Sequence, residues 1–328
     1  MKKSKSCQRI VLGVLLCVVV AFPFSSVLAA PDYPRKPVRL LIAFAPGGST
    51  DAMGRLIATK LSERLGHQFV AENIAGGGGT MASERVARSA PDGYTLLFNS
   101  TGIILNPMLA SAPYDPVKSF VPVAKIGNAV STLVVHPSVP ANTVKELIAL
   151  AKKQPGKLVA SAAGGGSFIH LSTELFKMMA DIDIKIVQFK GGGPAVVDLL
   201  GGHSQLFLGS LQQSLPHIKS GKIRALGYGA KSRSKFLPDL PTISEAGVPG
   251  YESFIWWGLY APAGTPKAVV DTLNRELEAI MKMPEIIKIF DAQGAEQDLL
   301  GPEAFTKFMQ AETAKWGKVI KQGNIKLE

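Results

Sequence analysis

Four glycine-rich segments of this chain have the composition of a small-ligand site, because each follows a hydrophobic run and precedes a helix-like pattern. Their sequences are VRLLIAFAPGGSTD (residues 38–51), IAGGGGTM (74–81), LVASAAGGGSFIH (158–170) and IKIVQFKGGGPA (184–195). Glycine lets the backbone approach a ligand closely, and the start of a helix presents unpaired N–H groups and the positive end of its dipole. Each junction is therefore either an anion cradle or simply a tight strand-to-helix turn, and their number favours a receptor for a small anion.

The elements around these segments predict an α/β fold. Strand-like runs alternate with amphipathic helical patterns along the chain, which is typical of α/β proteins with mainly parallel sheets. One predicted helical face after the first glycine loop consists of Met53, Leu56, Ile57, Leu61 and Leu65. The second half repeats the order of strand, glycine loop and helix, so we expect two domains with one cradle on each side of a shared cleft.

The first 29 residues have the pattern of a cleavable signal peptide. Its basic residues are Lys2, Lys3, Lys5 and Arg9. An apolar core over residues 10–22 follows and ends at Pro23, and small residues precede a cleavage site before Ala30. A spanning helix needs about 20 apolar residues, so export with cleavage is favoured over a membrane anchor, and Leu16 before Cys17 disfavours lipidation. We therefore expect an exported protein with a mature chain of 299 residues (328 minus 29).

The positions of the cysteines and the net charge argue against several classes of protein. Both cysteines, Cys7 and Cys17, lie in the signal peptide, so the mature chain is expected to have no disulfide, thiolate metal site or cysteine nucleophile. The net charge of +11 (36 minus 25) falls to +7 (32 minus 25) once the four signal cations are removed. This modest excess suits an anionic ligand, whereas the scattered charges do not form the basic stripe expected of a nucleic-acid-binding protein.

Known catalytic patterns are missing from the sequence. Neither Ser49, Ser167 nor Ser210 lies in a G-x-S-x-G elbow, and no phosphate-binding loop or dinucleotide fingerprint is present. The five histidines do not have paired metal-ligand spacing. We expect a protein without catalytic residues, metal or cofactor, and the alternative is a periplasmic hydrolase or isomerase that acts on a small carboxylate.

Seven blocks of sequence, taken in order, give a specific family resemblance. They include FAPGGSTDAMGRLIATKLSERLG, NIAGGGGTMASERVARSAPDGYTLLF, GGGSFIHLSTELF, FKGGGPAVVDLLGG, LPHIKSGKIRALG, LPTISEAGVPGYE and WWGLYAPAGTP. From about Tyr33 to near the C-terminus the chain resembles the solute-binding receptors of tripartite tricarboxylate transporters, the TctC or Bug family. The resemblance implies a two-domain periplasmic-binding-protein fold of type II, the Venus-flytrap kind, with two interdomain crossovers.

The resemblance also implies domain limits and partners. Residues 31–130 with 255–328 would form domain 1, and residues 131–254 would form domain 2. The receptor would capture a small organic carboxylate and deliver it to the integral-membrane permease subunits of the transporter, as a monomer and without a nucleic-acid partner. A dicarboxylate, a tricarboxylate, an acidic amino acid and an aromatic acid all remain open as ligands.

Candidate ligand-binding residues follow from matching the family's loops to this sequence. They are Phe44, Ala45, Pro46, Gly47, Gly48, Ser49, Thr50 and Asp51 in the first loop; Ser100 and Thr101 after the next strand; Ala163, Gly164, Gly165, Gly166, Ser167 and His170 in the opposing loop; and Gly191, Gly192 and Ser210. Asp51 is expected to brace its loop, since a bare carboxylate repels an anion. An isolated histidine such as His170 is commonly a packed, hydrogen-bonded residue, so direct ligand contact and a structural role both stay open for it.

Overall fold

The computed structural model of the protein describes residues 33–323 and 325. The predicted signal peptide, its cleavage site and both cysteines lie outside the described residues. Within the described part, no helix has both the length and the apolar character needed to cross a membrane.

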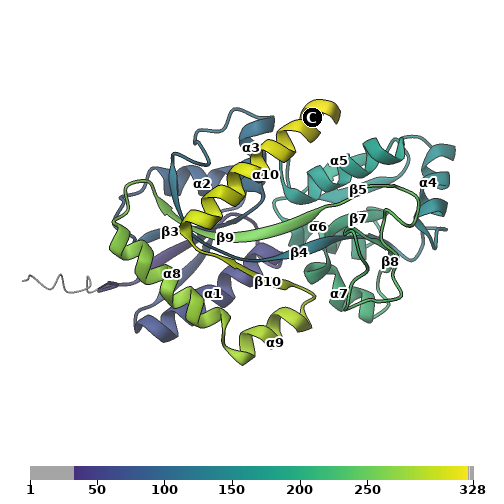
Figure 1. The fold of residues 1–328 in the computed structure, drawn as a ribbon. Coiled ribbons are helices and arrows are strands. Elements are labelled where there is room, and N and C mark those ends of the chain that lie inside the picture. The colour runs from purple at the N-terminus through teal and green to yellow at the C-terminus, as the bar shows by residue number, and fades with distance from the viewer. Residues whose placement is uncertain (1–32, 324, 326–328) are drawn as a thin grey trace, which may run out of the picture. The chain divides into compact units, whose positions relative to one another are not determined.

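Strands and helices alternate along the described chain (Figure 1). The strands are β1 (Val38–Ile42), β2 (Phe69–Asn73), β3 (Thr95–Ser100), β4 (Phe120–Val135), β5 (Val159–Ala162), β6 (Lys185–Gln188), β7 (Leu206–Ser210), β8 (Arg224–Tyr228), β9 (Phe254–Pro262) and β10 (Glu296–Leu300). The helices are α1 (Ser49–Leu65), the short 3-10 turn η1 (Gly77–Gly79), α2 (Thr80–Ala87), α3 (Gly102–Leu109), α4 (Val144–Lys153), α5 (Phe168–Ala180), α6 (Gly192–Leu200), α7 (Leu211–Lys219), α8 (Lys267–Met281), α9 (Pro284–Ala292) and α10 (Pro302–Gly323).

The strands share one sheet in the order β2-β1-β3-β9-β4-β7-β5-β6, and β8 and β10 also pair with β4. Strands β1, β2 and β3 are parallel, as are β5, β6 and β7. The expectation of mainly parallel pairing is wrong for the middle of the sheet, where β4 pairs antiparallel with β9, β7, β8 and β10. The reason is that β4 carries the chain into the segment after residue 135 and β9 brings it back from residue 254. These two neighbours, side by side in Figure 1, therefore run in opposite directions.

Strand β4 changes partners part-way along its length. Residues 120–130 pair with β9, whereas residues 131–135 pair with β7 and β8. This change coincides with the predicted domain limit at residues 130 and 131, and the return strand β9 begins at the other limit, residue 254. The pattern is what two crossovers require, while the domain limits themselves stay a prediction.

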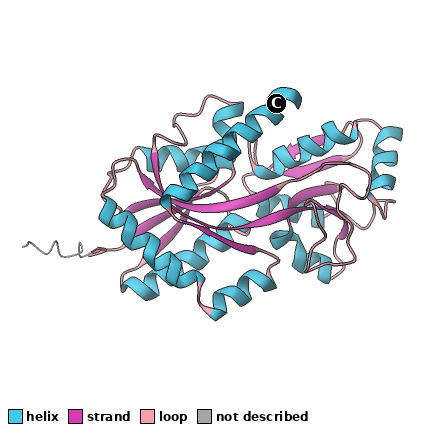
Figure 2. Cartoon of the chain, viewed as in Figure 1, coloured by secondary structure: helices cyan, strands magenta, loops and turns pink. Residues whose placement is uncertain are grey.

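Helices cover the sheet on both sides, above and below the strands in Figure 2. Met53, Ile57 and Leu61 on α1 are fully buried, which confirms the predicted apolar face of that helix. Trp256 on β9 is also fully buried and packs edge to face on the rings of Phe305 and Phe308 from α10. The packed core holds the strands in place, and the candidate site lies at the loops that follow β1, β3 and β5.

A buried lysine fastens the C-terminal elements to the central strand. The Lys125 side chain on β4 has 0% exposure and pairs with Asp298 on β10, whose side chain is 45% exposed. The Lys125 ammonium also lies 4.9 Å from the centre of the Phe308 ring. Burial lowers the pKa of Lys125, and the hydrogen bond that Lys125 donates to Asp298 opposes that effect. The two partners are unequal, since only the lysine depends on the pair for its polar contacts.

We predict that Asp298→Ala lowers the free energy of unfolding by about 2–3 kcal/mol, because it leaves a buried charge without its counter-charge. Lys125→Met leaves a carboxylate that water can reach, so its cost is expected to stay below about 1 kcal/mol. Urea denaturation of both variants at pH 7 measures the difference. A larger loss in Lys125→Met than in Asp298→Ala would contradict this account of the pair.

Candidate functional site

The first glycine loop joins β1 to the start of α1. Gly48 is the residue before the helix, and no side chain caps the first N–H groups of α1. Gly47 has φ 83°, a left-handed conformation that favours glycine. The Asp51 carboxylate accepts hydrogen bonds from the Gly47 N–H at 3.0 Å and from Arg55 Nε at 2.8 Å. Both oxygens of Asp51 thus hold the loop in shape, and its position at the helix start predicted this role.

The opposing loop joins β5 to α5 and is braced by its own side chains. The Ser167 hydroxyl accepts from the His170 N–H at 3.2 Å, and His170 Nδ1 accepts from the Gly166 N–H at 3.2 Å. Burial, with a smaller contribution from the positive charge of Lys177, lowers the pKa of His170 to about 4. The ring is therefore neutral at pH 7, and it positions the loop that surrounds the start of α5.

Loop residues 44–48 lie directly against the loop before α6. The Ala45 N–H donates to the Lys190 carbonyl oxygen at 3.1 Å. A Cβ atom at Gly193 would lie 2.3 Å from the Pro46 carbonyl oxygen, and one at Gly191 would lie 2.8 Å from the Ala45 nitrogen. Here backbone touches backbone, and only glycine permits that spacing.

A second contact of the same kind joins η1 to the loop before α5. A Cβ atom at Gly78 would lie 2.2 Å from the Gly165 carbonyl oxygen, and one at Gly166 would lie 2.1 Å from Asn106 Oδ1. Asn106 Nδ2 donates to the Gly78 carbonyl oxygen at 2.7 Å. All four glycine-rich segments therefore take part in two backbone contacts, and the segment at residues 76–80 serves packing.

A small cavity lies between these contacts. It has room of about 20 Å³, which is enough for a single water molecule. The lining residues are Phe44, Gly48, Ser49, Thr50, Ser100, Ala163, Ser167, Phe168, Ile169, Gly192, Gln213 and Ile255. They come from the starts of α1, α5, α6 and α7, from the loops before α1 and α5, from the last residue of β3 and from the start of β9. None of these described residues carries a charge, so helix N-termini dominate the local electrostatics and favour an anion.

The structure brings part of the predicted site to this cavity. Of the predicted residues, Phe44, Gly48, Ser49, Thr50, Ser100, Ala163, Ser167 and Gly192 line it. The others that were predicted, Ala45, Pro46, Gly47, Asp51, Thr101, Gly164, Gly165, Gly166, His170, Gly191 and Ser210, do not line it. Thr101 Oγ1, for example, accepts from the Trp256 N–H at 3.3 Å and so joins β3 to β9. Ligand contact at each of these positions stays a prediction.

Sequence reasoning missed four lining residues. Phe168, Ile169 and Ile255 supply apolar surface, and Gln213 supplies a side-chain amide. The first two lie inside the predicted loop 163–170, between Ser167 and His170, so the helix start itself was the available signal. Gln213 has no such signal, because it lies three residues after Ser210 in a helix of ordinary composition.

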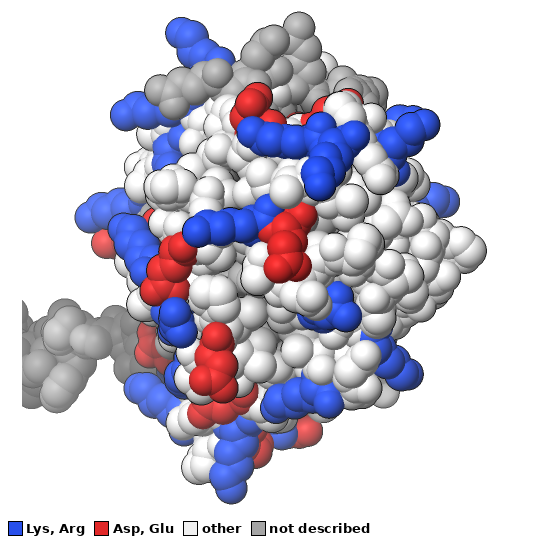
Figure 3. Space-filling view, turned by 90° about the vertical axis from the view of Figure 1, so that its right-hand side faces the viewer, with Lys and Arg blue, Asp and Glu red and all other residues white. Residues whose placement is uncertain are grey.

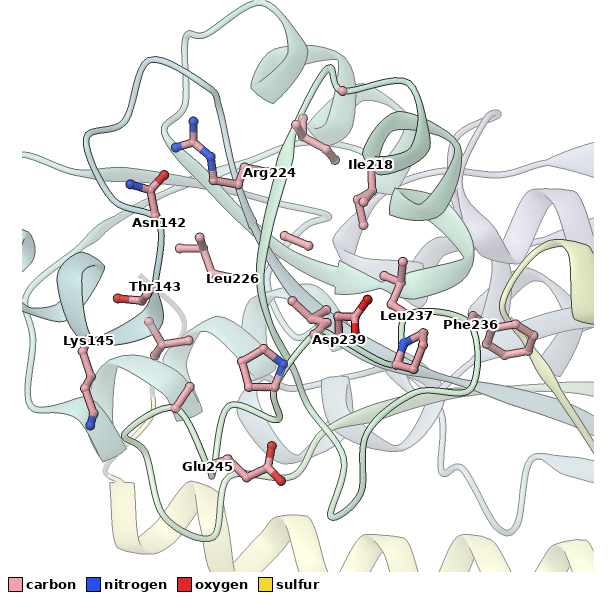
Figure 4. A pocket seen from close by; sticks show the side chains of 18 of the residues that line it. Asn142, Thr143, Lys145, Ile218, Arg224, Leu226, Phe236, Leu237, Asp239 and Glu245 are labelled. Atoms are coloured by element: carbon pink, nitrogen blue, oxygen red, sulfur yellow. The ribbon is translucent and has the colours of Figure 1, made fainter.

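Larger grooves elsewhere have no comparable arrangement. The groove of about 870 Å³ in Figure 4 lies between the start of α4, β8 and residues 236–241. Its Arg224 donates to the carbonyl oxygens of Val139 and Ala141, and its Glu245 accepts from the Thr242 N–H. These charges maintain local structure, and no predicted site residue lines the groove.

Charges and metal-ligand side chains do not mark another site on the described residues. On the face shown in Figure 3, the Lys and Arg side chains are interspersed with Asp and Glu. Among residues 33–323 and 325, no group of three His, Cys, Asp or Glu side chains is placed to hold a metal ion.

A comparison with protein families identifies the chain. The family model for the tripartite tricarboxylate transporter family receptor, TctC, matches residues 53–325. The chain belongs to this family. As a TctC receptor, it is a member of a family of solute-binding proteins, and the predicted resemblance is confirmed.

Solved structures of TctC relatives agree with the fold. Rpa4515 of Rhodopseudomonas palustris, solved with adipate, is 38% identical, with a TM-score of 0.87 over 90% of this chain and 99% of that one. The periplasmic binding protein BugD is 34% identical, with a TM-score of 0.86 over 90% and 100%. MatC of Rhodopseudomonas palustris, with bound malate, is 30% identical, with a TM-score of 0.83 over 88% and 100%. The predicted two-domain periplasmic-binding-protein fold is thus confirmed.

The buried, neutral His170 predicts a pH-dependent stability. Because its pKa in the folded protein is about 4 and that of an unfolded histidine is about 6.5, its contribution is fully present above pH 6.5 and is lost as the pH falls toward 4. We expect this to remove about 2–3 kcal/mol between pH 7 and pH 4.5. His170→Asn keeps an acceptor for the Gly166 N–H without that titration, so its unfolding free energy should fall less over the same range. Equal losses in both proteins would refute this role of His170.

The contact between loops 44–48 and 190–194 predicts the effect of one methyl group. Gly193→Ala adds a Cβ 2.3 Å from the Pro46 oxygen, while alanine favours the start of α6. Because the Pro46 backbone has to move to admit this methyl group, we expect a lower melting temperature, and at least about tenfold weaker ligand binding because the loops cannot approach as closely. Gly317→Ala on α10 is the matched control, since its Cβ would meet nothing within 4 Å. Normal affinity in Gly193→Ala would rule out the loop contact as part of binding.

Proposed function

We propose that this TctC receptor is a periplasmic protein that captures a small organic carboxylate between residues 44–50 and 163–170. It then delivers the ligand to the membrane permease subunits of a tripartite tricarboxylate transporter. The observation that carries the proposal is the meeting of several helix starts at a cavity whose described lining residues have no charge. Unpaired N–H groups at helix starts bind carboxylates without a positively charged side chain.

The relatives support this class of ligand. Rpa4515 and MatC, which are 38% and 30% identical to this chain, were solved with adipate and malate. Both ligands are small dicarboxylates, so we propose a ligand with at least one ionised carboxylate. The hydroxyl groups of Ser49, Thr50 and Ser100 line the same cavity and are available as further donors.

Binding would proceed by closure of two domains, residues 31–130 with 255–328 and residues 131–254. The contacts of loops 44–48 and 190–193, and of η1 with loop 163–166, would then be made between the domains. Because the cavity has room for only about one water molecule, the ligand enters while these loops are apart. Closure around the ligand excludes water and strengthens its hydrogen bonds.

The geometry does not favour the alternative of a hydrolase or isomerase. Ser167 and His170 are neighbours, but the hydroxyl accepts from the histidine backbone and the ring accepts from Gly166. A nucleophile and base would instead share a direct hydrogen bond between their side chains. We propose a receptor that acts as a monomer, is exported by a cleaved signal peptide and works without metal or cofactor.

The proposal is tested by a thermal-shift screen of organic acids on refolded, ligand-stripped protein. The panel contains adipate, malate, citrate, glutamate, nicotinate and terephthalate, because a ligand raises the melting temperature in proportion to its saturation of the folded state. For the tightest binder, calorimetry then compares the acid with its neutral amide. We expect the amide to bind at least about tenfold more weakly, a loss of about 1.4 kcal/mol, and a chelator to leave affinity unchanged.

Two results would count against the proposal. Equal affinity for the acid and its amide would show that the helix starts do not recognise a negative charge. Catalytic turnover of a carboxylate ester, in place of stoichiometric binding, would favour the enzyme alternative.

A further inference from the structure

Gln213 is an unpaired amide at the wall of the cavity. It is the third residue of α7, and its side chain lines the space between loops 44–50 and 163–170. Its Nε2 atom is buried and has no hydrogen-bond partner among the described residues. A buried N–H group without an acceptor costs free energy, so it indicates either a strained side chain or a missing acceptor.

The neighbouring residue in the same helix, Gln212, makes a structural contact and serves for comparison. Gln212 is buried, and its Nε2 donates to Gln293 Oε1 at 2.9 Å, which ties α7 to the turn after α9. Gln213 has no such partner, although it lies one residue further along. The N–H groups of the two adjacent amides therefore differ: that of Gln212 has an acceptor within the protein, although the Gln212 Oε1 atom is itself buried without a partner, whereas the N–H group of Gln213 has none among the described residues.

A glycine makes room for the Gln213 side chain. A Cβ atom at Gly192 would lie 2.5 Å from Gln213 Oε1, so the bare backbone at the start of α6 makes room for the amide. Gly48 lies against the same place, since its Cβ would be 3.5 Å from the Gly192 nitrogen. Gln213 thus stands beside the uncapped starts of α1 and α6, where an anion is favoured.

A second polar group on the cavity wall is also unpaired. Ser100 is 1% exposed, lines the same cavity, and its hydroxyl has no partner among the described residues. Two unpaired polar side chains therefore lie on the wall of one cavity. We take this as a sign that a bound ligand supplies their hydrogen-bond acceptors.

Gln213 also separates this cavity from the surface. Among the described residues, only Gly48 and Gln213 line both the cavity and an adjoining groove of about 600 Å³ that runs past Pro46 and Pro194. The amide is therefore the flexible part of the wall between the buried space and the outside, and Gly48 is the rigid part.

We propose that Gln213 Nε2 donates a hydrogen bond to an oxygen atom of the bound carboxylate, at the end of the cavity where Gly48 and Gly192 meet. The inference rests on the proposed function and adds a specificity-determining side chain to it. Gln213 belongs to α7 and Gly48 to the loop before α1, so an oxygen held by both groups connects the two sides of the closing contact. In this orientation the side chain presents its N–H group to the cavity, so it favours a ligand with an acceptor at this point over one with a donor.

The test compares Gln213→Met, Gln213→Glu and the control Gln212→Met, with adipate as the first probe and malate as the second. Gln213→Met removes the unpaired N–H at similar volume, so the melting temperature without ligand should stay equal or rise. The dissociation constant measured by calorimetry should rise by about tenfold, as expected for a lost hydrogen bond to a charged group. Gln213→Glu places an acceptor and a negative charge there and should weaken binding further.

Gln212→Met should behave in the opposite way, with a lower melting temperature and an unchanged dissociation constant. The proposal is overturned if Gln213→Met binds both probes like the wild type, or if Gln213→Glu binds as tightly as the wild type. A fall in melting temperature of Gln213→Met with unchanged affinity would show a structural amide and would also overturn it. Failure of the wild-type protein to bind any acid of the screening panel would instead overturn the proposed function, and this inference with it.

Discussion

The close approach of backbone to backbone at the glycine loops is the constraint on which the site depends. Gly193 lies against Pro46, and Gly78 lies against Gly165, at spacings that leave no room for a Cβ atom. These contacts bring the starts of α1, α5 and α6 within reach of one cavity. Without them the helix starts would face solvent separately, and each would attract anions only weakly.

The side chains around the cavity follow from the same constraint. Since the helix starts supply the positive potential, a nearby carboxylate has to be neutralised, and Asp51 is held by Gly47, Arg55 and Asn73. A charged histidine would carry a large desolvation cost in this region, and His170 is kept neutral by burial. Each loop is thus braced by hydrogen bonds to its own side chains, and such preorganisation reduces the entropy lost on binding.

The sequence predicted the parts of the fold that local chemistry determines. Glycine runs between strands and apolar helical faces located the loops at residues 44–50 and 163–170 and the buried face of α1, because these signals lie within a few residues of one another. The direction of β4 and β9 could not be predicted, since an apolar run looks the same whether its partner is parallel or antiparallel. Gln213 was missed for a related reason: only the fold places this helical glutamine beside glycines at 48 and 192.

The cavity is formed partly by backbone groups and partly by side chains, and this difference affects how such receptors can diversify. In the proposed mechanism, most of the groups that bind the ligand and close on it are backbone groups, which survive almost any side-chain substitution outside the glycines. The remaining wall consists of exchangeable side chains such as Phe168, Ile169, Gln213 and Ile255. Point mutations at these four positions alter the shape and polarity offered to a ligand without disturbing the machinery of capture. If this chain binds its ligand as proposed, receptors for new ligands can arise from one ancestral gene by duplication and a few substitutions in the wall, each intermediate still able to close.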